Sequence, residues 1–197
     1  SANEVRKIQV SIPSDVEQQK IAGLLSLIDE RIATQNKIIE DLKKLKSAIS
    51  KHLFARKDLL ETTICLSDIA TLKNGYAFQS GMYNVGRVSL CKTGNYLLNQ
   101  RVGLLQLAKN VDQEFLYQIL SSQRFENNMI ACGQGAAQMN IGKGDVESFV
   151  LPYSSNVNNI RLVAKILHLY DECVINELRR LILLTMQKQY FLAQMFI

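Results

Sequence analysis

Residues 21–55 read IAGLLSLIDERIATQNKIIEDLKKLKSAISKHLFA, and the same apolar pattern returns 142 residues later in VAKILHLYDECVINELRRLILLTMQKQYFLAQMFI, residues 163–197. The matched positions include Leu25 and Leu167, Ile28 and Tyr170, Ile32 and Val174, Ile39 and Leu181, Leu42 and Leu184, Ile49 and Phe191, Asp29 and Asp171, and Lys46 and Lys188. The apolar steps alternate between three and four residues, which is the period of a helix that presents one seam to a partner. A long helix repeated around a different middle segment predicts two struts that hold one module.

The residues before each copy are typical of a helix start. Pro13 precedes the first copy and Pro152 the second. Ser14 or Asp15 can cap the first helix, with Glu17 as the acid of a capping box. We therefore expect helices over about 15–57 and from about 157 to the end of the sequence. A polar–apolar alternation in residues 4–13 predicts a short strand before the first helix.

The middle segment carries mixed signals. Residues 62–72 favour a short strand and turn, 85–107 favour two or three short strands, and 145–152 favour a strand that ends at proline. Residues 111–131 have helical spacing, with Asp112 as a cap and an expected break near Ser121-Ser122. A glycine-rich polar loop is expected over 132–144. These elements predict an α+β fold: a small mixed domain at one end of a long antiparallel two-helix coiled coil.

The charge is uneven along the chain, whose formal net charge is +5. Residues 1–60 carry 11 basic and 8 acidic side chains, residues 61–152 carry 7 of each, and residues 153–197 carry 5 and 3. This balance permits nucleic-acid binding without requiring it, because solvated helix faces also account for the basic excess.

The four cysteines are far apart, and none forms a C-x-x-C pair. With only two histidines beside them, they indicate neither a zinc site nor a disulfide framework, and they favour a reducing cytoplasm. We see no signal peptide and no apolar run long enough to span a bilayer, so we expect a cytoplasmic protein without a membrane partner.

No catalytic motif emerges from the sequence. An aromatic N-P-P-Y motif is absent, and Gly142-Lys143-Gly144 lacks the spacing of a phosphate-binding loop. Asp145, Glu147 and Lys143 lie close together, but a turn and a solvated strand edge explain them better than a nuclease centre. We therefore expect a protein that is not an enzyme and has no catalytic residues, cofactor or metal site.

Three separate motifs resemble the specificity subunits of type I restriction-modification systems. The first is Ile12-Pro13, Glu17-Gln18, Ile21-Ala22 and Ile28-Asp29 through Ile32, with the helix exit at residues 51–54. The second comprises Leu66, Asp68-Ile69-Ala70, Gly75, Ala77-Phe78 and Ser80. The third comprises Gly135, Gln138 and Asn140-Ile141, followed by Leu151-Pro152. Their order along the chain makes the resemblance specific, and it covers nearly the whole sequence.

The resemblance implies a division into four parts. Residues 1–14 would be the tail of a first recognition domain, 15–60 conserved helix 1, 61–152 a target-recognition domain and 153–197 conserved helix 2. The chain departs from the family in having one recognition domain instead of two. Its central strands also look short near residues 84–88, and Asn156-Val157-Asn158-Asn159 stands where Glu-Gln is expected.

Polar side chains in the loops are the candidates for reading DNA. Glutamine and asparagine can pair with adenine and arginine or lysine with guanine in the major groove, while nearby glycines let backbone amides approach phosphates. One cluster is Lys73, Asn74, Tyr76, Gln79 and Ser80; a second is Gln134, Gln138, Asn140 and Lys143; between them lie Arg87, Lys92, Asn95, Gln100 and Arg101. An ordinary turn residue is the alternative interpretation for each of them.

The function implied by the resemblance is that of a DNA sequence-specificity subunit. It would read one half of a bipartite site, with its helices as the ruler that fixes the spacer. Its expected partners are double-stranded DNA, the methyltransferase (modification) subunits and, through them, the restriction subunit. A second copy of the chain is a further candidate partner, associated head to tail through exposed seams at Gln35, Ile39, Glu177 and Leu181; a monomer is the alternative. The alternatives are a helical scaffold or protein-interaction module without DNA readout, and a fragment of a fused restriction-methyltransferase enzyme.

Overall fold

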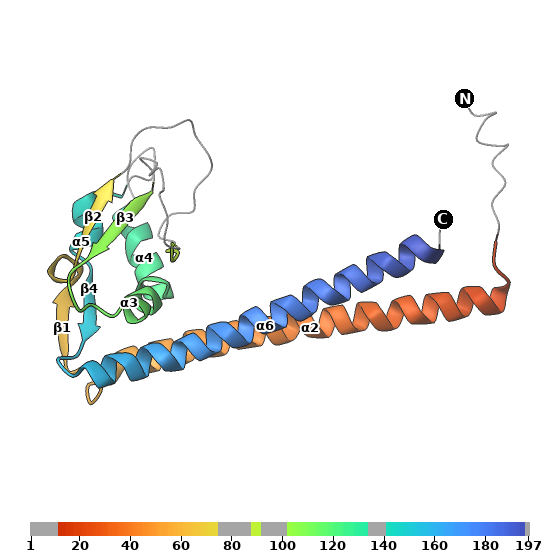
Figure 1. Cartoon of the computed structure of the whole chain (residues 1–197), viewed down its shortest axis with the longest axis horizontal. Helices are drawn as coiled ribbons and strands as arrows, with labels where there is room; N and C mark the ends of the chain where they lie inside the picture. The colour runs from red at the N-terminus through yellow and green to blue at the C-terminus, as the bar shows by residue number, and fades with distance from the viewer. Residues whose placement is uncertain (1–11, 75–87, 92–101, 134–140, 196–197) are drawn as a thin grey trace, which may run out of the picture. The chain divides into compact units, whose positions relative to one another are not determined.

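The computed structural model describes residues 12–74, 88–91, 102–133 and 141–195. Two long helices, α2 (Asp15–Ala55) and α6 (Val157–Met195), enclose all the other elements in sequence (Figure 1). Between them lie β1 (Thr62–Cys65), the 3-10 turn η1 (Leu66–Asp68), β2 (Ala70–Asn74), β3 (Gly103–Leu107), α3 (Gln113–Leu120), α4 (Gln123–Cys132), α5 (Lys143–Glu147) and β4 (Val150–Tyr153). The fold is α+β, as the sequence predicts.

The chain divides into two compact units, and the boundary crosses both long helices. Unit 1 comprises Ser1–Asp41 and Val174–Ile197, and unit 2 comprises Leu42–Cys173. Each unit is therefore built from one stretch of α2, one stretch of α6 and, in unit 2, all the remaining elements.

The start of α2 shows the Glu17 half of the predicted capping box. The backbone N–H and the hydroxyl of Ser14 both donate to Glu17 Oε2, at 2.9 and 2.7 Å. These bonds lower the pKa of Glu17, the side-chain bond to the hydroxyl being the larger cause. The carboxylate also lies near the positive end of the helix dipole, which stabilises its charge.

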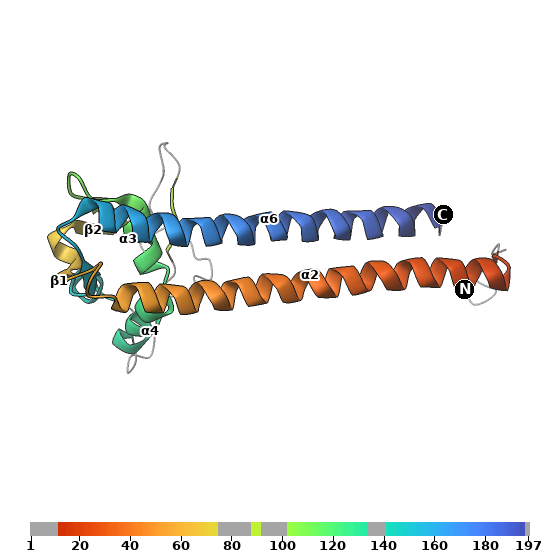
Figure 2. The same cartoon turned by 90° about the horizontal axis from the view of Figure 1, so that it is seen from below.

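In unit 1 the two helical segments run antiparallel, side by side (Figure 2). Gln35 Nε2 donates to Glu177 Oε2 at 2.6 Å, and Lys188 Nζ lies 2.5 Å from Asp29 Oδ1. Ile28 and Ile39 are buried, at the spacing that the repeat predicts for the seam. The apolar seam is thus covered within the chain.

This packing corrects one expectation about self-association. Gln35 and Ile39 were predicted to form an exposed seam with Glu177 and Leu181, but Gln35 and Ile39 are only 8% and 4% exposed. Glu177 is hydrogen-bonded to Gln35, and Leu181 is half-buried. The sequence pattern identified the seam correctly, but a pattern does not reveal whether the second helix of the same chain covers it.

Unit 2 contains two small antiparallel sheets. β1 pairs with β4, with Thr62 opposite Tyr153 and Cys65 opposite Val150. β2 pairs with β3, with Ala70 opposite Leu107. The core includes Leu66 from η1, Leu151 from β4, Phe115 and Ile119 from α3, and Leu167 from α6. The ends of the long helices in this unit therefore share one core with the mixed elements.

The break between α3 and α4 falls at Ser121-Ser122, as predicted. Asp112 Oδ1 accepts the Phe115 N–H at 2.9 Å and caps α3, and the Ser122 hydroxyl caps α4.

Other predicted boundaries differ. α2 ends two residues early at Ala55, and β4 begins only at Val150, because residues 143–147 form α5. The predicted strand over 4–13 lies almost wholly outside the described residues. In 85–107 only β3 is seen among the described positions.

Candidate nucleic-acid interface

The ladder of β2 and β3 fixes where the first predicted reading segment leaves and rejoins the fold. Asn74, the last residue of β2, pairs with Gly103, the first residue of β3. The 28 residues between them therefore begin and end on one rung of the ladder. A side chain at position 103 would crowd Leu72, since an added Cβ would meet Leu72 Cδ1 at 2.5 Å.

Helix α5 brings the end of the second predicted loop to the same strand. Glu147 Oε1 accepts the Leu72 N–H at 2.9 Å, and Lys143 Nζ lies 3.6 Å from the same oxygen. At the helix start, the Gly142 N–H donates to Asp145 Oδ2 at 2.8 Å. Glu147 thereby connects Lys143, the first residue of α5, to Leu72 in the middle of β2. Leu72 lies two residues before Asn74, where β2 ends.

Three of the fourteen predicted DNA-reading residues lie in the described structure. Lys73 is exposed on β2, between the buried Leu72 and the end of the strand. Asn74 closes the strand through its backbone pairing, and Lys143 opens α5. The structure brings the Lys73 strand and Lys143 together through Glu147. The other eleven lie outside the described residues: Tyr76, Gln79, Ser80, Arg87, Lys92, Asn95, Gln100, Arg101, Gln134, Gln138 and Asn140.

Glu147 is an organising residue that the sequence interpretation missed. It was assigned, with Asp145 and Lys143, to a turn and a solvated strand edge. The Glu147 side chain is only 20% exposed, and it satisfies a backbone N–H of β2. The signal for a helix was present, because Gly142 followed three residues later by Asp145 is a helix-start pattern.

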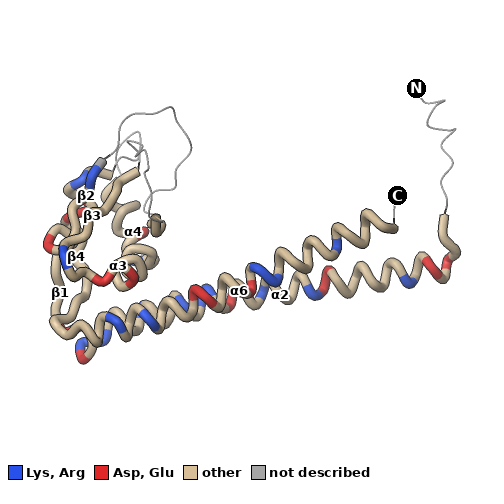
Figure 3. The backbone as a smooth tube through the Cα atoms, viewed as in Figure 1, with Lys and Arg blue, Asp and Glu red and all other residues tan. Residues whose placement is uncertain are grey.

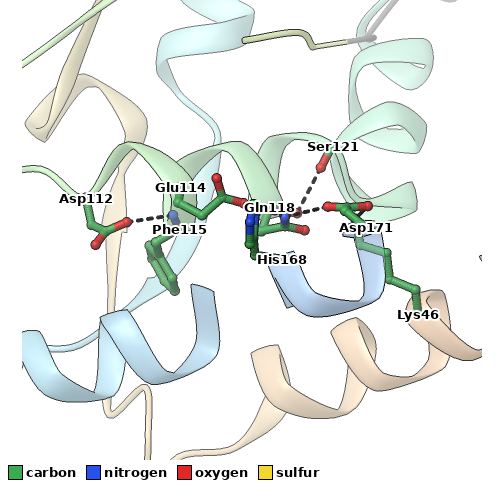
Figure 4. A network of polar contacts seen from close by, with 8 residues as sticks. All are labelled: Lys46, Asp112, Glu114, Phe115, Gln118, Ser121, His168 and Asp171. Carbon is green, nitrogen blue, oxygen red and sulfur yellow. Dashed lines mark hydrogen bonds and ion pairs between the residues drawn. The ribbon is translucent and has the colours of Figure 1, made fainter. Parts of the chain in front are cut away.

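Elsewhere in unit 2, a polar network joins α3 to both long helices (Figure 4). The Gln118 amide donates to Glu114 Oε1 at 2.8 Å and to Asp171 Oδ2 at 2.7 Å, and Lys46 Nζ lies 2.5 Å from Asp171 Oδ1. His168 Nδ1 lies 3.3 Å from Glu114 Oε1. Gln118 itself is 1% exposed. The network fixes α3 against α2 and α6, and α3 supplies much of the core.

The charges in this network affect a neighbouring phenol. Burial raises the pKa of Tyr117, and the carboxylates of Asp171 and Glu114 raise it further. Tyr117 therefore stays neutral, while Asp171 beside it is paired with Lys46.

A second polar junction closes unit 2 where β1 meets the lead-in to α6. Glu61 Oε1 accepts the Ser155 N–H at 2.7 Å and the Ser155 hydroxyl at 3.0 Å. Backbone hydrogen bonds from Glu61 itself and from Ser155 are the largest causes that lower the pKa of Glu61 from 4.5 to about 2. The ionised carboxylate ties together two segments 94 residues apart in sequence.

Within the described ranges, no group of three or more histidine, cysteine, aspartate or glutamate side chains is arranged to hold a metal ion. Cys65, Cys91, Cys132 and Cys173 are all free thiols. None of the described helices is both long enough and apolar enough to cross a membrane.

Comparison with solved structures identifies the class of fold. The chain matches the crystal structure of a type I restriction-modification system S subunit from M. genitalium, with a TM-score of 0.64 and 19% sequence identity. The match covers 93% of this chain and 62% of the other, so this chain spans less than two-thirds of that subunit. No protein-family model and no curated protein sequence matches the chain. The chain thus has the fold of a type I S subunit along nearly all its length.

Proposed function

We propose that this protein is a non-catalytic DNA-specificity subunit of a type I restriction-modification complex. It reads one half of a bipartite DNA site and docks the methyltransferase subunits, which in turn recruit the restriction subunit. The proposal is supported by the S-subunit fold and by the three ordered motifs that resemble this family. We retain the four-part division at residues 14, 60 and 152, with the two conserved helices as an antiparallel coiled-coil ruler for the spacer.

The main support for DNA reading is that the ends of the two predicted polar loops lie close together. The Asn74–Gly103 rung and the Glu147 contacts to Leu72 and Lys143 hold the borders of two polar loop segments at one edge of unit 2. Residues from both segments can then act on one stretch of duplex. Base-edge contacts from such side chains specify sequence, while lysines such as Lys73 and Lys143 act on phosphates or guanine.

The charge balance favours a reader that acts in a complex. Residues 61–152 carry equal numbers of basic and acidic side chains. Phosphate contacts dominate the affinity of DNA-binding proteins, so a neutral domain binds weakly by itself. Methyltransferase subunits that close around the duplex would supply the missing positive charge. A second copy of this chain, or a further recognition domain, would read the other half-site.

The proposal is tested by assembling the chain with the modification subunit encoded beside its gene. Mass photometry of the mixture, with and without duplex DNA, should show a defined complex. Selection from a random duplex library should then enrich one short motif. Absence of a complex, or a complex that enriches no motif, would contradict the specificity-subunit function.

Two lysine variants sharpen this test. Lys73→Ala and Lys143→Ala should each weaken DNA binding by the complex, and each should reduce the salt slope by about 1 if the lysine contacts a phosphate. Lys57→Ala, an exposed lysine after the end of α2, serves as the matched control and should leave the slope unchanged. Equal effects of all three would indicate a diffuse charge effect.

The alternative, a scaffold that binds only proteins, makes a different prediction. Such a protein would form a complex with a protein partner, but the complex would show no sequence preference on DNA, and the Lys73 and Lys143 variants would behave as the control does.

A further inference from the structure

The outer face of α6 in unit 1 is apolar and exposed. Ile182, Leu183, Met186 and Tyr190 are 58%, 64%, 59% and 61% exposed, and Ile175 and Leu178 are each 38% exposed. We define these six residues as the outer stripe. The seam residues Val174, Leu181, Leu184 and Phe191 face the partner helix and are less exposed.

Charge is nearly absent from the C-terminal part of this face, beyond Glu177, Arg179 and Arg180. From Leu181 to Met195 the single charged side chain is Lys188, which pairs with Asp29 on α2. Figure 3 shows the contrast: charged segments recur along α2, whereas the part of α6 that approaches the C-terminus is almost uniformly uncharged. An exposed helix face with several large apolar side chains and so little charge is unusual, because the outer side of a helix is normally polar.

The internal repeat shows that the stripe is not a general property of this helical frame. The residues 142 positions earlier on α2 are Ala33, Asn36, Glu40, Asp41, Lys44 and Ala48. Any partner that recognises both halves of the repeat in the same way would need a matching apolar face on α2. A partner that binds the stripe therefore has one such site on each chain within the described residues.

We propose that a second copy of this chain covers the outer stripe, through antiparallel pairing of the two α6 helices around a two-fold axis at Ile182. This inference names the interface for the second copy that the proposed function includes. The interface itself is argued from the stripe alone, without reference to DNA.

The spacing of the stripe suits such an axis. Relative to Ile182, the apolar positions fall at −7 (Ile175), −4 (Leu178), +4 (Met186) and +8 (Tyr190). An axis at Ile182 places Leu178 of one copy opposite Met186 of the other, and Ile175 opposite Tyr190. A two-fold interface must be self-complementary in this way.

The position of Arg179 selects antiparallel over parallel pairing. Arg179 lies within the outer stripe, between Leu178 and Ile182, and its guanidinium Nη1 donates to Asn176 Oδ1 at 3.1 Å. Antiparallel pairing around Ile182 places Arg179 opposite Thr185 of the other copy. Parallel pairing would place the two Arg179 side chains side by side, where like charges repel.

The exposed area is sufficient for a dimer of modest affinity. Six large side chains at these exposures present apolar surface on the order of 500 Å², within the range at which a patch on a monomer is commonly an interaction site. Counted on both copies, about 1,000 Å² is covered before flanking residues are included, which is the lower end for specific interfaces.

The test is the oligomeric state of the full chain, measured without DNA by sedimentation equilibrium over a concentration series. The wild type should be a dimer. The double variant Ile182→Glu/Met186→Glu should raise the dissociation constant by about 100-fold or more, because apolar contacts are lost and four carboxylates are introduced at the axis. Ala33→Glu, at the repeat-equivalent position of Ile175 on α2, is the matched control and should remain dimeric.

Folding is monitored independently by circular dichroism, and all three proteins should have the same helix content since the substituted side chains are exposed. A wild-type monomer at all concentrations would overturn the proposal and assign the stripe to another partner. A dimer that survives the double variant would overturn it as well. Neither outcome bears on the DNA-selection test, so the two proposals fail separately.

Spin labels test the axis. In a background with all four cysteines replaced by serine, labels at Thr185→Cys and Gln194→Cys are compared by pulsed electron paramagnetic resonance. Antiparallel pairing at Ile182 makes the inter-copy distance about 27 Å longer along the helix for position 194 than for position 185. Equal short distances at both positions would mean parallel helices and would overturn the proposed axis.

Discussion

Gln118 is the most buried polar side chain in the described part of the chain, at 1% exposure. Its amide nitrogen donates to carboxylates from two elements, Glu114 on α3 and Asp171 on α6, while its Oε1 has no hydrogen-bond partner. Hydrogen bonds to charged groups are among the stronger ones in proteins, and they compensate for the unpartnered oxygen. A neutral donor between two carboxylates also reduces their mutual repulsion.

Changing Gln118 should therefore destabilise unit 2. Gln118→Leu removes both donated bonds and is expected to lower the free energy of unfolding by about 1–3 kcal/mol in urea titrations. Gln118→Glu should be worse at neutral pH, since it adds a third carboxylate, and it should recover partly in acid. Gln123→Leu, on the exposed side of α4, should change stability by less than about 0.5 kcal/mol. A stable Gln118→Glu protein at pH 7 would contradict this account.

Glu61 gives the molecule an acid-sensitive junction. Its pKa is lowered from 4.5 to about 2 in the folded chain, so the ionised form stabilises folding fully above pH 4.5. That stabilisation is lost as the pH falls from 4.5 to about 2. Glu61→Gln should be less stable than the wild type at pH 7, and the two proteins should converge by pH 2. Thermal melts across this range, with Glu172→Gln on the exposed face of α6 as control, measure the difference.

Local residue patterns predicted several contacts correctly, because both partners lie within one helical turn. The Ser14–Glu17 box, the Asp112 cap and the break at Ser121-Ser122 belong to this group. Gln118 and Glu61 were not predicted, because their partners are 53 and 94 residues away. An isolated polar residue shows no periodic pattern that would identify its partner in a distant segment, whereas the long apolar seam does. Most of the predicted reading side chains lie outside the described residues, so their roles remain predictions.

At the scale of elements, two ion pairs are equivalent under the 142-residue repeat. Lys46–Asp171 in unit 2 and Lys188–Asp29 in unit 1 exchange when each residue is replaced by its counterpart. Both have an N–O distance of 2.5 Å. Their surroundings differ: the first pair is 19% and 26% exposed, and the second 31% and 54%.

Double-mutant cycles to alanine should separate these two pairs despite their equal geometry. Exposed ion pairs contribute about 0.2–1 kcal/mol, and we expect Lys188–Asp29 at the low end of that range. Lys46–Asp171 should show a coupling energy of about 1 kcal/mol or more, since it is less solvated and also shares Gln118. Added salt should reduce the first coupling more than the second. Equal couplings would show that burial does not decide their strength.

The contact of α5 with β2 gives a further prediction at this scale. Glu147→Ala removes the acceptor of the Leu72 N–H, so that amide should exchange faster with deuterium and stability should fall by about 1–2 kcal/mol. Glu147→Gln keeps an acceptor oxygen but loses the ion pair with Lys143, and it should leave the Leu72 amide protected. If both variants protect Leu72 equally, the side chain does not hold the two elements together.

The sequence predicted long elements better than short ones. The seam of α2 and α6 repeats over many turns, and the two helices begin at the expected residues. Helix α5 has five residues, too few to show a period, so residues 145–149 were assigned to a strand. Its local signal, Gly142 with Asp145, was weaker than the alternation that follows it.

At the scale of the whole molecule, the excess positive charge lies outside the predicted reading segment, and this limits the affinity of the isolated chain for DNA. With 7 basic and 7 acidic side chains in residues 61–152, the isolated chain should bind random duplex weakly, at the level of non-specific contacts. Fluorescence anisotropy in increasing salt should show binding that disappears near physiological ionic strength. Tight, salt-insensitive binding of random DNA by the isolated chain would contradict the need for a partner subunit.

The repeated ion pairs do not by themselves determine which helices pair with each other. The Gln35–Glu177 contact supplies the missing distinction. Because Asp29 and Asp171 are equivalent, as are Lys46 and Lys188, these residues alone cannot distinguish an α2–α6 pair from a pair of two α6 helices. Gln35 and Glu177 are each other's counterparts in the repeat, and they differ in charge. Pairing two α6 helices through their seams would bring two Glu177 carboxylates together, whereas the native pair gives Glu177 an amide donor. This difference between the two halves thus disfavours a pair of two α6 seams and favours the pairing of α2 with α6.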